Sequence, residues 1–204
     1  MTKTCYTREQ IETAVKSKDY KWFENGDYNV NIVGVRNSET GTRVTNRFDD
    51  CITISYKEDG EWKFHCFECT TDPGDDWMDS PMNSKGCAIL VPGQYRGSHK
   101  LRLHQGRYLA LGQQRSVKVY RDRDKDGHYD FDESTIDEGL FGINIHRATK
   151  YAGKTSTYVD KWSAGCQVIA SNDDWHTFLD ICQTARDKWS NNFTYTLIES
   201  KDIV

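Results

Sequence analysis

The chain has 204 residues, with 27 Lys and Arg against 31 Asp and Glu, which gives a formal net charge of −4. This length suits a single domain, the aromatic share of 12% is enough for a packed core, and no apolar run approaches the ~20 residues of a membrane-spanning helix. Because there is no basic excess to hold a phosphate backbone, we do not expect a nucleic-acid partner, and because no apolar run is long enough, we do not expect a membrane span.

The N-terminal part of the chain is predicted to be one short helix followed by strands. Residues 7–10 have the form of a capping box, with apolar residues at helical spacing after them. Residues 30–35 and 51–56 alternate or are β-branched, which is typical of strands. A turn after the second strand leads into the alternating residues 62–67, so the pair is predicted to form a hairpin. A loop then runs from residue 70 to about residue 85.

The C-terminal part is predicted to hold further short strands and the main helix. Residues 171–174 are able to cap a helix at 173–189, whose apolar residues recur at three and four positions. The predicted strands are residues 88–91, 108–111, 117–120, 141–146 and 193–198. Strands outnumber helices, so the predicted class is α+β and rich in β structure.

Residues 122–133 match the calcium loop of an EF-hand. Acidic residues fall at positions 1, 3, 5, 9 and 12 of the twelve, and glycine is at position 6. The flanking residues indicate a loop entered from a strand. The alternative is a solvated acidic hairpin without an ion, and calcium, if bound, would be structural. The predicted ligands are the carboxylates of Asp122, Asp124, Asp126, Asp130 and Glu133 and the backbone carbonyl of His128.

The seven cysteines are an odd number, and the first ten residues show no secretory signal, so we expect most of them to be reduced. His65-Cys66-Phe67-Glu68-Cys69 contains one C-x-x-C. A zinc or redox site is possible there, but packing on alternate faces of a hairpin is the favoured interpretation.

The candidate catalytic residues are Cys166 and His146. Cys166 follows Ser163-Ala164-Gly165, a small-residue turn that a substrate carbonyl can approach closely. The amides of Gly165 and Cys166 are then candidates for an oxyanion hole. His146 ends an alternating apolar segment, and its imidazole could take the thiol proton and stabilise a thiolate. The alternative is a buried structural cysteine and a core histidine.

These residues resemble the motif of the L,D-transpeptidase catalytic-domain family, cysteine acyltransferases of bacterial peptidoglycan. Sixteen residues separate His146 from Ser163-Ala164-Gly165-Cys166, where the family has Ser/Thr-His-Gly-Cys. With Ala164 in place of the second histidine, the chain resembles a divergent, phage-associated branch. The resemblance implies a β-sandwich or mixed sheet with one main C-terminal helix. It also implies that Cys166 is the nucleophile, His146 the base, the Arg147 carbonyl the group that orients the imidazole, and Ser163 and Gly165 the residues that shape the turn.

The resemblance covers residues 88–198, which would be the catalytic core. Residues 1–85 would be a branch-specific, β-rich extension within the same single domain, 1–204. The implied function is that of a phage-encoded, endolysin-like cysteine peptidase that hydrolyses peptidoglycan stem peptides through an acyl-enzyme, with no cofactor for catalysis. It would be made in the host cytoplasm and act at the cell wall or within a virion. The alternatives are an L,D-transpeptidase proper and a virion structural or cargo protein with a vestigial site.

Three further residues are candidates for substrate binding. Trp162 precedes the cysteine turn and is a candidate wall of a groove, although core packing explains it equally well. His104 and Tyr95 lie in a segment rich in cations and aromatic rings, where Arg96, Lys100 and Arg102 suit a peptide carboxylate. Ordinary solvated turns are the alternative for that segment.

Overall fold

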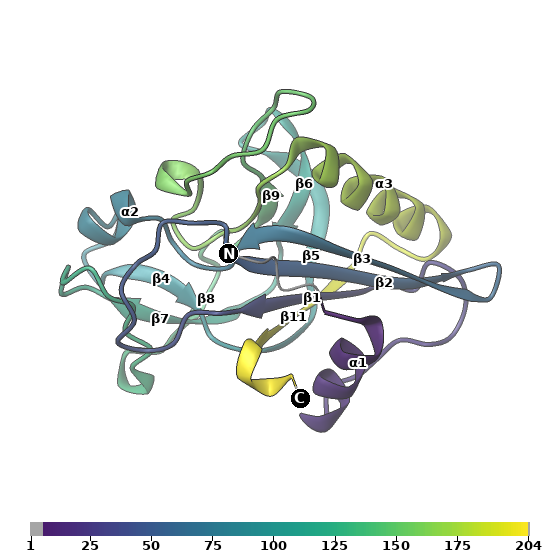
Figure 1. Ribbon diagram of the computed structural model, residues 1–204, viewed down its shortest axis with the longest axis horizontal. Helices are drawn as coiled ribbons and strands as arrows, with labels where there is room; N and C mark the ends of the chain where they lie inside the picture. Colours follow the sequence, from purple (N-terminus) through teal and green to yellow (C-terminus); the bar gives the residue numbers. More distant parts are fainter. Residues whose placement is uncertain (1–5, 204) are drawn as a thin grey trace.

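Eight strands close into a mixed barrel in the computed structural model, which describes residues 6–203 (Figure 1). Cys5 lies outside the described residues. Most neighbouring strands are antiparallel, but β1 runs parallel to β11 and β9 runs parallel to β10. Around the barrel the strands are β1 (Asn31–Arg36), β11 (Phe193–Glu199), β5 (Gly93–His104), β6 (Tyr108–Gln113), β9 (Ile145–Arg147), β10 (Gln167–Ile169), β3 (Glu61–Thr70) and β2 (Asp50–Glu58).

A second, three-stranded sheet lies beside the barrel, with β7 between β4 and β8. Its strands are β4 (Cys87–Leu90), β7 (Val117–Asp122) and β8 (Asp137–Gly139). The helices are α1 (Arg8–Ser17), α2 (Asp75–Asp79) and α3 (Asn172–Lys188), with one-turn 3-10 helices at Glu133–Thr135, Asp160–Trp162 and Ser200–Asp202. None of these described helices is both long and apolar enough to cross a membrane.

The two longer helices cover opposite faces of the strands, as Figure 1 shows. The apolar face of α3, which includes Trp175 and Phe178, packs into the main core with Ile32 of β1. The next residue of β1, Val33, points the other way and packs with Ile11 of α1. Because both faces of β1 are covered, all six of its residues are buried, and its central residues 32–35 are apolar without alternation, between the buried polar residues Asn31 and Arg36.

The predicted β-rich class with one main C-terminal helix is confirmed. Thr7 caps α1 through the expected capping box with Gln10, and the β2–β3 hairpin turns at Asp59 and Gly60 as predicted. The C-x-x-C residues lie on opposite faces of β3: Cys69 is in the main core, and Cys66 packs against the cluster under α1.

The main sheet is mixed, as one of the implied arrangements is, but it is a closed barrel beside a small sheet, and it does not establish an L,D-transpeptidase fold. The main sheet closes on itself, and three of its eight strands, β1, β2 and β3, come from the first 85 residues. The proposed division into an extension and a core remains a prediction, but the barrel runs through both parts. β3 pairs with β10, directly after Cys166, so the N-terminal strands help to position the cysteine turn.

Candidate active site

Cys166 and His146 come from the two neighbouring parallel strands β9 and β10. His146 pairs with Val168, and Cys166 immediately precedes the pair Gln167–Ile145. Ile145 belongs to the main core, whereas Val168 and Cys166 pack in a separate outer cluster. Since side chains alternate along a strand, His146 and Cys166 lie on the same outer face of the barrel. The topology therefore brings together the two residues that the sequence motif singled out.

The cysteine turn is closed by Ser163. Its hydroxyl accepts a hydrogen bond from the Gly165 amide (3.1 Å) and donates one to the carbonyl of Cys166 (2.8 Å). Gly165 has φ +121°, and a Cβ at this position would lie 2.2 Å from the carbonyl oxygen of Ala88. Only glycine fits this close approach of two backbones. Ser163 and Gly165 thus shape the turn in the way that the resemblance implies.

The imidazole of His146 is oriented by a backbone carbonyl. Its Nδ1 lies 2.8 Å from the carbonyl oxygen of Arg147, which only accepts hydrogen bonds, so Nδ1 carries the proton and Nε2 keeps its lone pair. His104 stacks on the ring, with centroids 4.4 Å apart. Burial lowers the pKa of His146 to about 4, partly offset by the Arg147 carbonyl and reinforced by His104. At neutral pH the ring is therefore a neutral base.

At neutral pH the thiol of Cys166 is expected to be protonated. Burial raises its pKa to about 11, and a hydrogen bond from the backbone N–H of Asn144 acts in the opposite direction by favouring the thiolate. Sγ donates to the carbonyl of Gly142 (3.3 Å), and within residues 6–203 no hydrogen bond joins it to His146. The expected thiolate beside an imidazolium is thus not the resting state, because two partly desolvated groups both favour their neutral forms.

The predicted pair of oxyanion donors is reduced to one. The amide of Gly165 is already engaged by the Ser163 hydroxyl, so it is not available to a substrate. The amide of Cys166 has no backbone acceptor among the described residues. A carbonyl bound at Sγ would therefore find the Cys166 amide as its backbone donor.

Two residues that the motif did not identify complete the cluster. The Tyr108 hydroxyl lies 3.4 Å from the protonated Nδ1 of His146, so its oxygen is placed as a second acceptor for that N–H, and burial raises the pKa of Tyr108 to about 12, so the hydroxyl stays neutral. The Asn144 side chain donates to Nδ1 of His104 (3.3 Å) and thereby fixes the ring that stacks on His146. Their only sequence signal is position: Tyr108 pairs with His104 across β5 and β6, and Asn144 precedes β9.

The other sequence candidates are divided between the cluster and the rest of the molecule. The Arg147 guanidinium lies 4.4 Å from the centroid of the Tyr108 ring and donates to Asn172 (3.3 Å), so it borders the cluster. Trp162 is 45% exposed just before the cysteine turn. Tyr95 is not at the site: it lies nine residues from His104 along β5, about 30 Å at the rise of a strand, and its hydroxyl donates to Val91 (2.6 Å).

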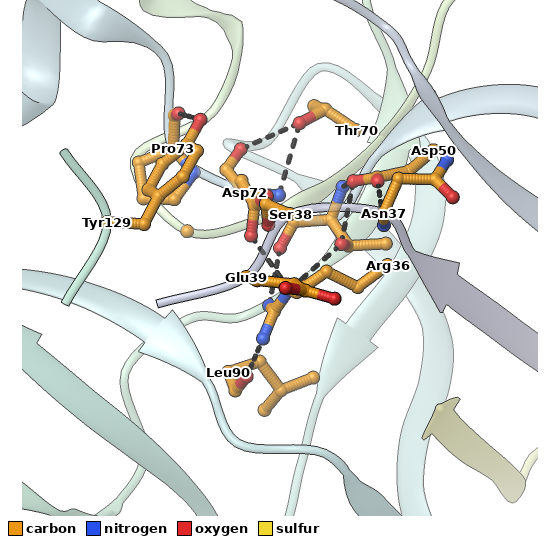
Figure 2. Close-up of polar contacts among 12 residues, drawn as sticks. Arg36, Asn37, Ser38, Glu39, Asp50, Thr70, Asp72, Pro73, Leu90 and Tyr129 are labelled. Atoms are coloured by element: carbon orange, nitrogen blue, oxygen red, sulfur yellow. Dashed lines mark hydrogen bonds and ion pairs between the residues drawn. The ribbon is translucent and has the colours of Figure 1, made fainter. Parts of the chain in front are cut away.

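A fully buried arginine lies behind the cysteine turn, which the sequence analysis did not anticipate. Figure 2 shows Arg36 between Asp72, with which it forms an ion pair (2.8 Å), and the carbonyl of Leu90, to which it donates (2.8 Å). Arg36 also donates to the carbonyl of Thr71 (3.0 Å), and Ser38 donates to Asp72. The charges of Arg36 and Asp72 are thus paired and hydrogen-bonded, which is what makes their burial tolerable.

A second carboxylate in the same network, Asp50, accepts from the amides of Asn37 and Thr71 (2.7 Å each) and from the Thr71 hydroxyl (2.8 Å) (Figure 2). Burial and the neighbouring Asp72 raise the pKa of Asp50 to about 7. The amide of Gln167 links the network to the site by donating to Thr71 (3.4 Å) and to the carbonyl of Gly165 (3.2 Å). The buried network therefore supports the turn that carries Cys166.

The acidic loop leaves β7 at Asp122, as the sequence predicts, and is followed by a single 3-10 turn rather than a helix. Asp122 accepts from the amide of Asp130 (2.9 Å), and its pKa is raised to about 6 by burial and by the charges of Asp130, Asp124 and Asp126. This mutual repulsion is what a bound cation would relieve. In residues 6–203, however, no three His, Cys, Asp or Glu side chains are grouped as a metal site, so the loop fits calcium only in part.

No protein-family model matches the chain, and neither a curated protein nor a solved structure is significantly similar to it. The likeness to L,D-transpeptidases therefore rests on the motif residues around His146 and Cys166.

Proposed function

We propose that the protein is a cysteine-dependent peptidase of peptidoglycan stem peptides, working through an acyl-enzyme on Cys166. One observation carries the proposal: His146 and Cys166 share the outer face of adjacent parallel strands, with Nδ1 of the imidazole fixed on the Arg147 carbonyl and Nε2 left as a base. A nucleophile, a nearby base and a group that orients the base are the elements of nucleophilic catalysis. The wall substrate comes from the motif resemblance.

In the first half of the reaction, Nε2 of His146 takes the proton of the Cys166 thiol as Sγ attacks the substrate carbonyl carbon. The developing oxyanion is placed to accept from the Cys166 amide. The tetrahedral intermediate then expels the amine, which takes the proton from the imidazolium, and a thioester remains. Because both groups are neutral at rest, proton transfer accompanies the attack rather than preceding it.

In the second half, His146 removes a proton from the acceptor as it attacks the thioester. With water as the acceptor, the products are a carboxylic acid and the regenerated thiol, and with an amine the product is a new peptide bond. Arg147 borders the cluster, and its guanidinium is suited to hold a free carboxylate of the substrate. Hydrolysis is the primary proposal, and transpeptidation is the alternative acceptor chemistry of the same site.

A virion structural or cargo protein with a vestigial site is the second candidate. The observation that favours it is the resting state of the pair, in which Sγ binds the carbonyl of Gly142 and the thiol pKa is raised rather than lowered. A reactive cysteine has a lowered pKa in most enzymes. This candidate predicts no turnover of wall material.

Digestion of purified peptidoglycan, with mass spectrometry of the new termini, tests these functions. We expect wild-type protein to release stem-peptide fragments, and Cys166→Ala and His146→Ala each to lower the rate by about a thousandfold or more. His176→Ala, at an exposed position of α3, is the matched control and should leave the rate unchanged. Adding a D-amino acid separates transfer, which incorporates it, from hydrolysis. A wild-type rate equal to that of Cys166→Ala would reject the enzyme in favour of the structural protein.

We also propose that residues 122–133 bind calcium in a structural role. The support is the spacing of the acidic residues, together with the pKa values of Asp122 and Asp130, which are raised by burial and further by the neighbouring carboxylates. The ligands would be the carboxylates of Asp122, Asp124, Asp126, Asp130 and Glu133 and the carbonyl of His128.

A further inference from the structure

A pocket of about 270 Å³ lies at the other end of β5 from His104. It lies among β5, the end of α3 and the start of β11, and no residue of the Cys166–His146 cluster lines it. Its walls include the aromatic rings of Phe23, Tyr28 and Trp189, and Arg96 and Arg115 supply positive charge. Neither Asp nor Glu is among the residues that line it.

The two arginines of this pocket are available to a ligand. Among the described residues, neither has a carboxylate partner, whereas Arg36, Arg121 and Arg186 each form an ion pair. Arg115 is held in place because its Nη1 donates to the carbonyl of Arg96 (3.3 Å). The guanidinium of Arg96 lies 5.3 Å from the centroid of the Phe23 ring. Two unpaired guanidiniums in a protein of net charge −4 make this pocket a local site for an anion.

The base of the pocket is also organised. The carbonyl of the Asn192 side chain accepts from Gln114 (2.9 Å), which orients the amide, and within residues 6–203 its Nδ2 has no hydrogen-bond acceptor and is open to a ligand. Gly97 allows this arrangement, because a Cβ there would lie 2.6 Å from Asn192 and 3.1 Å from Arg115. An oriented amide beside two guanidiniums offers donors for both hydroxyl groups and an acid group.

Trp189 supplies a flat apolar surface at the edge of the pocket. It is 55% exposed, but its ring is fixed, because Nε1 donates to the carbonyl of Asp27 (2.8 Å). An exposed large aromatic ring held in one orientation is suited to stack on a ligand ring. The mixed lining, with Asn29, Ser190 and Thr194 beside the aromatic rings, suits a ring that is apolar on its faces and polar at its edge.

We propose that this pocket binds an acidic sugar, a single pyranose ring that carries a carboxylate or a phosphate. The ring would stack on Trp189, its hydroxyl or acetamide groups would bind Asn192, and the acid group would lie between Arg96 and Arg115. The choice among sugars follows the proposed wall substrate, whose glycan contains muramic acid with its carboxylate free wherever the stem peptide has been removed, but binding at this pocket does not require Cys166 to be catalytic.

Calorimetric titration of the full chain with three related sugars tests the proposal. N-acetylmuramic acid carries a carboxylate, N-acetylglucosamine 1-phosphate carries a phosphate, and N-acetylglucosamine is the neutral control. We expect at least one acidic sugar to bind at millimolar concentration or below, at least about tenfold tighter than the neutral one. The comparison between the two acids identifies the acid group. Equal affinities for all three, or no binding of either acid at millimolar concentration, would overturn the proposal.

Variants locate the binding. Arg96→Gln and Arg115→Gln should each remove most of the difference between acidic and neutral sugar, and Trp189→Ala should weaken all three. Arg43→Gln is the control for a lost charge, because Arg43 is exposed and lies outside the pocket. If Arg43→Gln weakens binding as much as Arg96→Gln does, the attraction is general and the pocket is not the site. Cys166→Ala should bind as the wild type does, which separates this proposal from the catalytic one.

Discussion

The molecule has two clusters of polar side chains on either side of the cysteine turn, and they differ in how completely they are hydrogen-bonded. Around Arg36, nearly every donor and acceptor has a partner within the protein. Around Cys166 and His146, the Nε2 of the imidazole and the Cys166 amide have no hydrogen-bond partner in the part of the chain that the structure describes, so both are open to a ligand. A network in which the buried polar groups are hydrogen-bonded to each other stabilises the fold. Polar groups without partners beside a partly exposed thiol are instead available to bind and react with a substrate. The contrast indicates which cluster is support and which is site.

The largest expected effect on stability comes from removing the buried ion pair between Arg36 and Asp72. Arg36→Met leaves Asp72 buried without its ion-pair partner, and we expect it to lower the free energy of unfolding by about 3–5 kcal/mol. Chemical denaturation measures this. Arg186→Met, which removes an exposed ion pair with Asp187, is the control and should leave the free energy of unfolding nearly unchanged, because solvent screens that pair. Adding Asp72→Asn to Arg36→Met should recover part of the loss. A cost below about 1 kcal/mol for Arg36→Met alone would show that this network is not the support.

A smaller loss is expected where the support meets the site. Gly165→Ala places a Cβ 2.2 Å from the carbonyl of Ala88 in a backbone conformation that alanine disfavours, so we expect about 1–3 kcal/mol of destabilisation and loss of peptidoglycan digestion. Gly153→Ala is the matched control: its φ is also positive, at +68°, but its Cβ would meet open space. It should cost about 1 kcal/mol and leave the activity intact. Equal effects of the two substitutions would mean that the contact with Ala88 is not required.

The protonation state of the site can be followed through the reactivity of the thiol. Because the pKa of Cys166 is raised to about 11, its thiolate fraction should rise about tenfold per pH unit up to that value. The alkylation rate by iodoacetamide should therefore climb steadily from pH 6 to about pH 10. Peptide mapping distinguishes Cys166 from the buried Cys69, Cys87 and Cys182, which should react more slowly. A rate already constant at neutral pH would indicate a thiolate–imidazolium pair instead.

The smallest expected effect concerns the acidic loop, which adds a third polar region to the comparison. If calcium binds the folded state and not the unfolded state, a free calcium concentration ten times its Kd raises the free energy of unfolding by about 1.4 kcal/mol. Thermal melts with calcium and with a chelator should differ accordingly, and Asp124→Asn should reduce the difference. Asp19→Asn, outside the loop, is the control. Identical melts of wild-type protein under both conditions at millimolar calcium would leave the loop as a solvated acidic hairpin.

Much of the fold follows from local patterns in the sequence. The capping box at Thr7, the hairpin turn at Asp59 and the apolar spacing of α3 are signals contained within a few residues, and each is confirmed. The closure of the barrel is not local, because it depends on pairings such as Ile32 with Tyr195. No alternation within one segment specifies its distant partner.

The elements that were missed or misjudged have identifiable physical causes. The sequence analysis did not predict β5, because its twelve residues include many charged and polar side chains and show no apolar alternation. Two of these polar residues, Ser98 and His99, are nevertheless buried. Strand β9 begins at Ile145 rather than near residue 141, because the side chain of Gln113 accepts from the amides of Phe141 and Ile143 and takes the place of a strand partner.

The candidate site could be predicted only as far as its motif. His146 and Cys166 are adjacent in a parallel pair, which agrees with the spacing argument, but Tyr108, Asn144 and the network around Arg36 come from segments with no motif of their own. The protonation states were not predictable, since they depend on burial and on the stacked ring of His104.

The parallel pairing of β1 with β11 has a consequence for how the molecule is made. Ile32 and Tyr195 are neighbours in the sheet although 163 positions separate them along the chain. A growing polypeptide would therefore emerge from the ribosome with one edge of its first strand unpaired until β11 has been synthesised. During that interval the unpaired edge of the nascent chain is open to mispairing and aggregation.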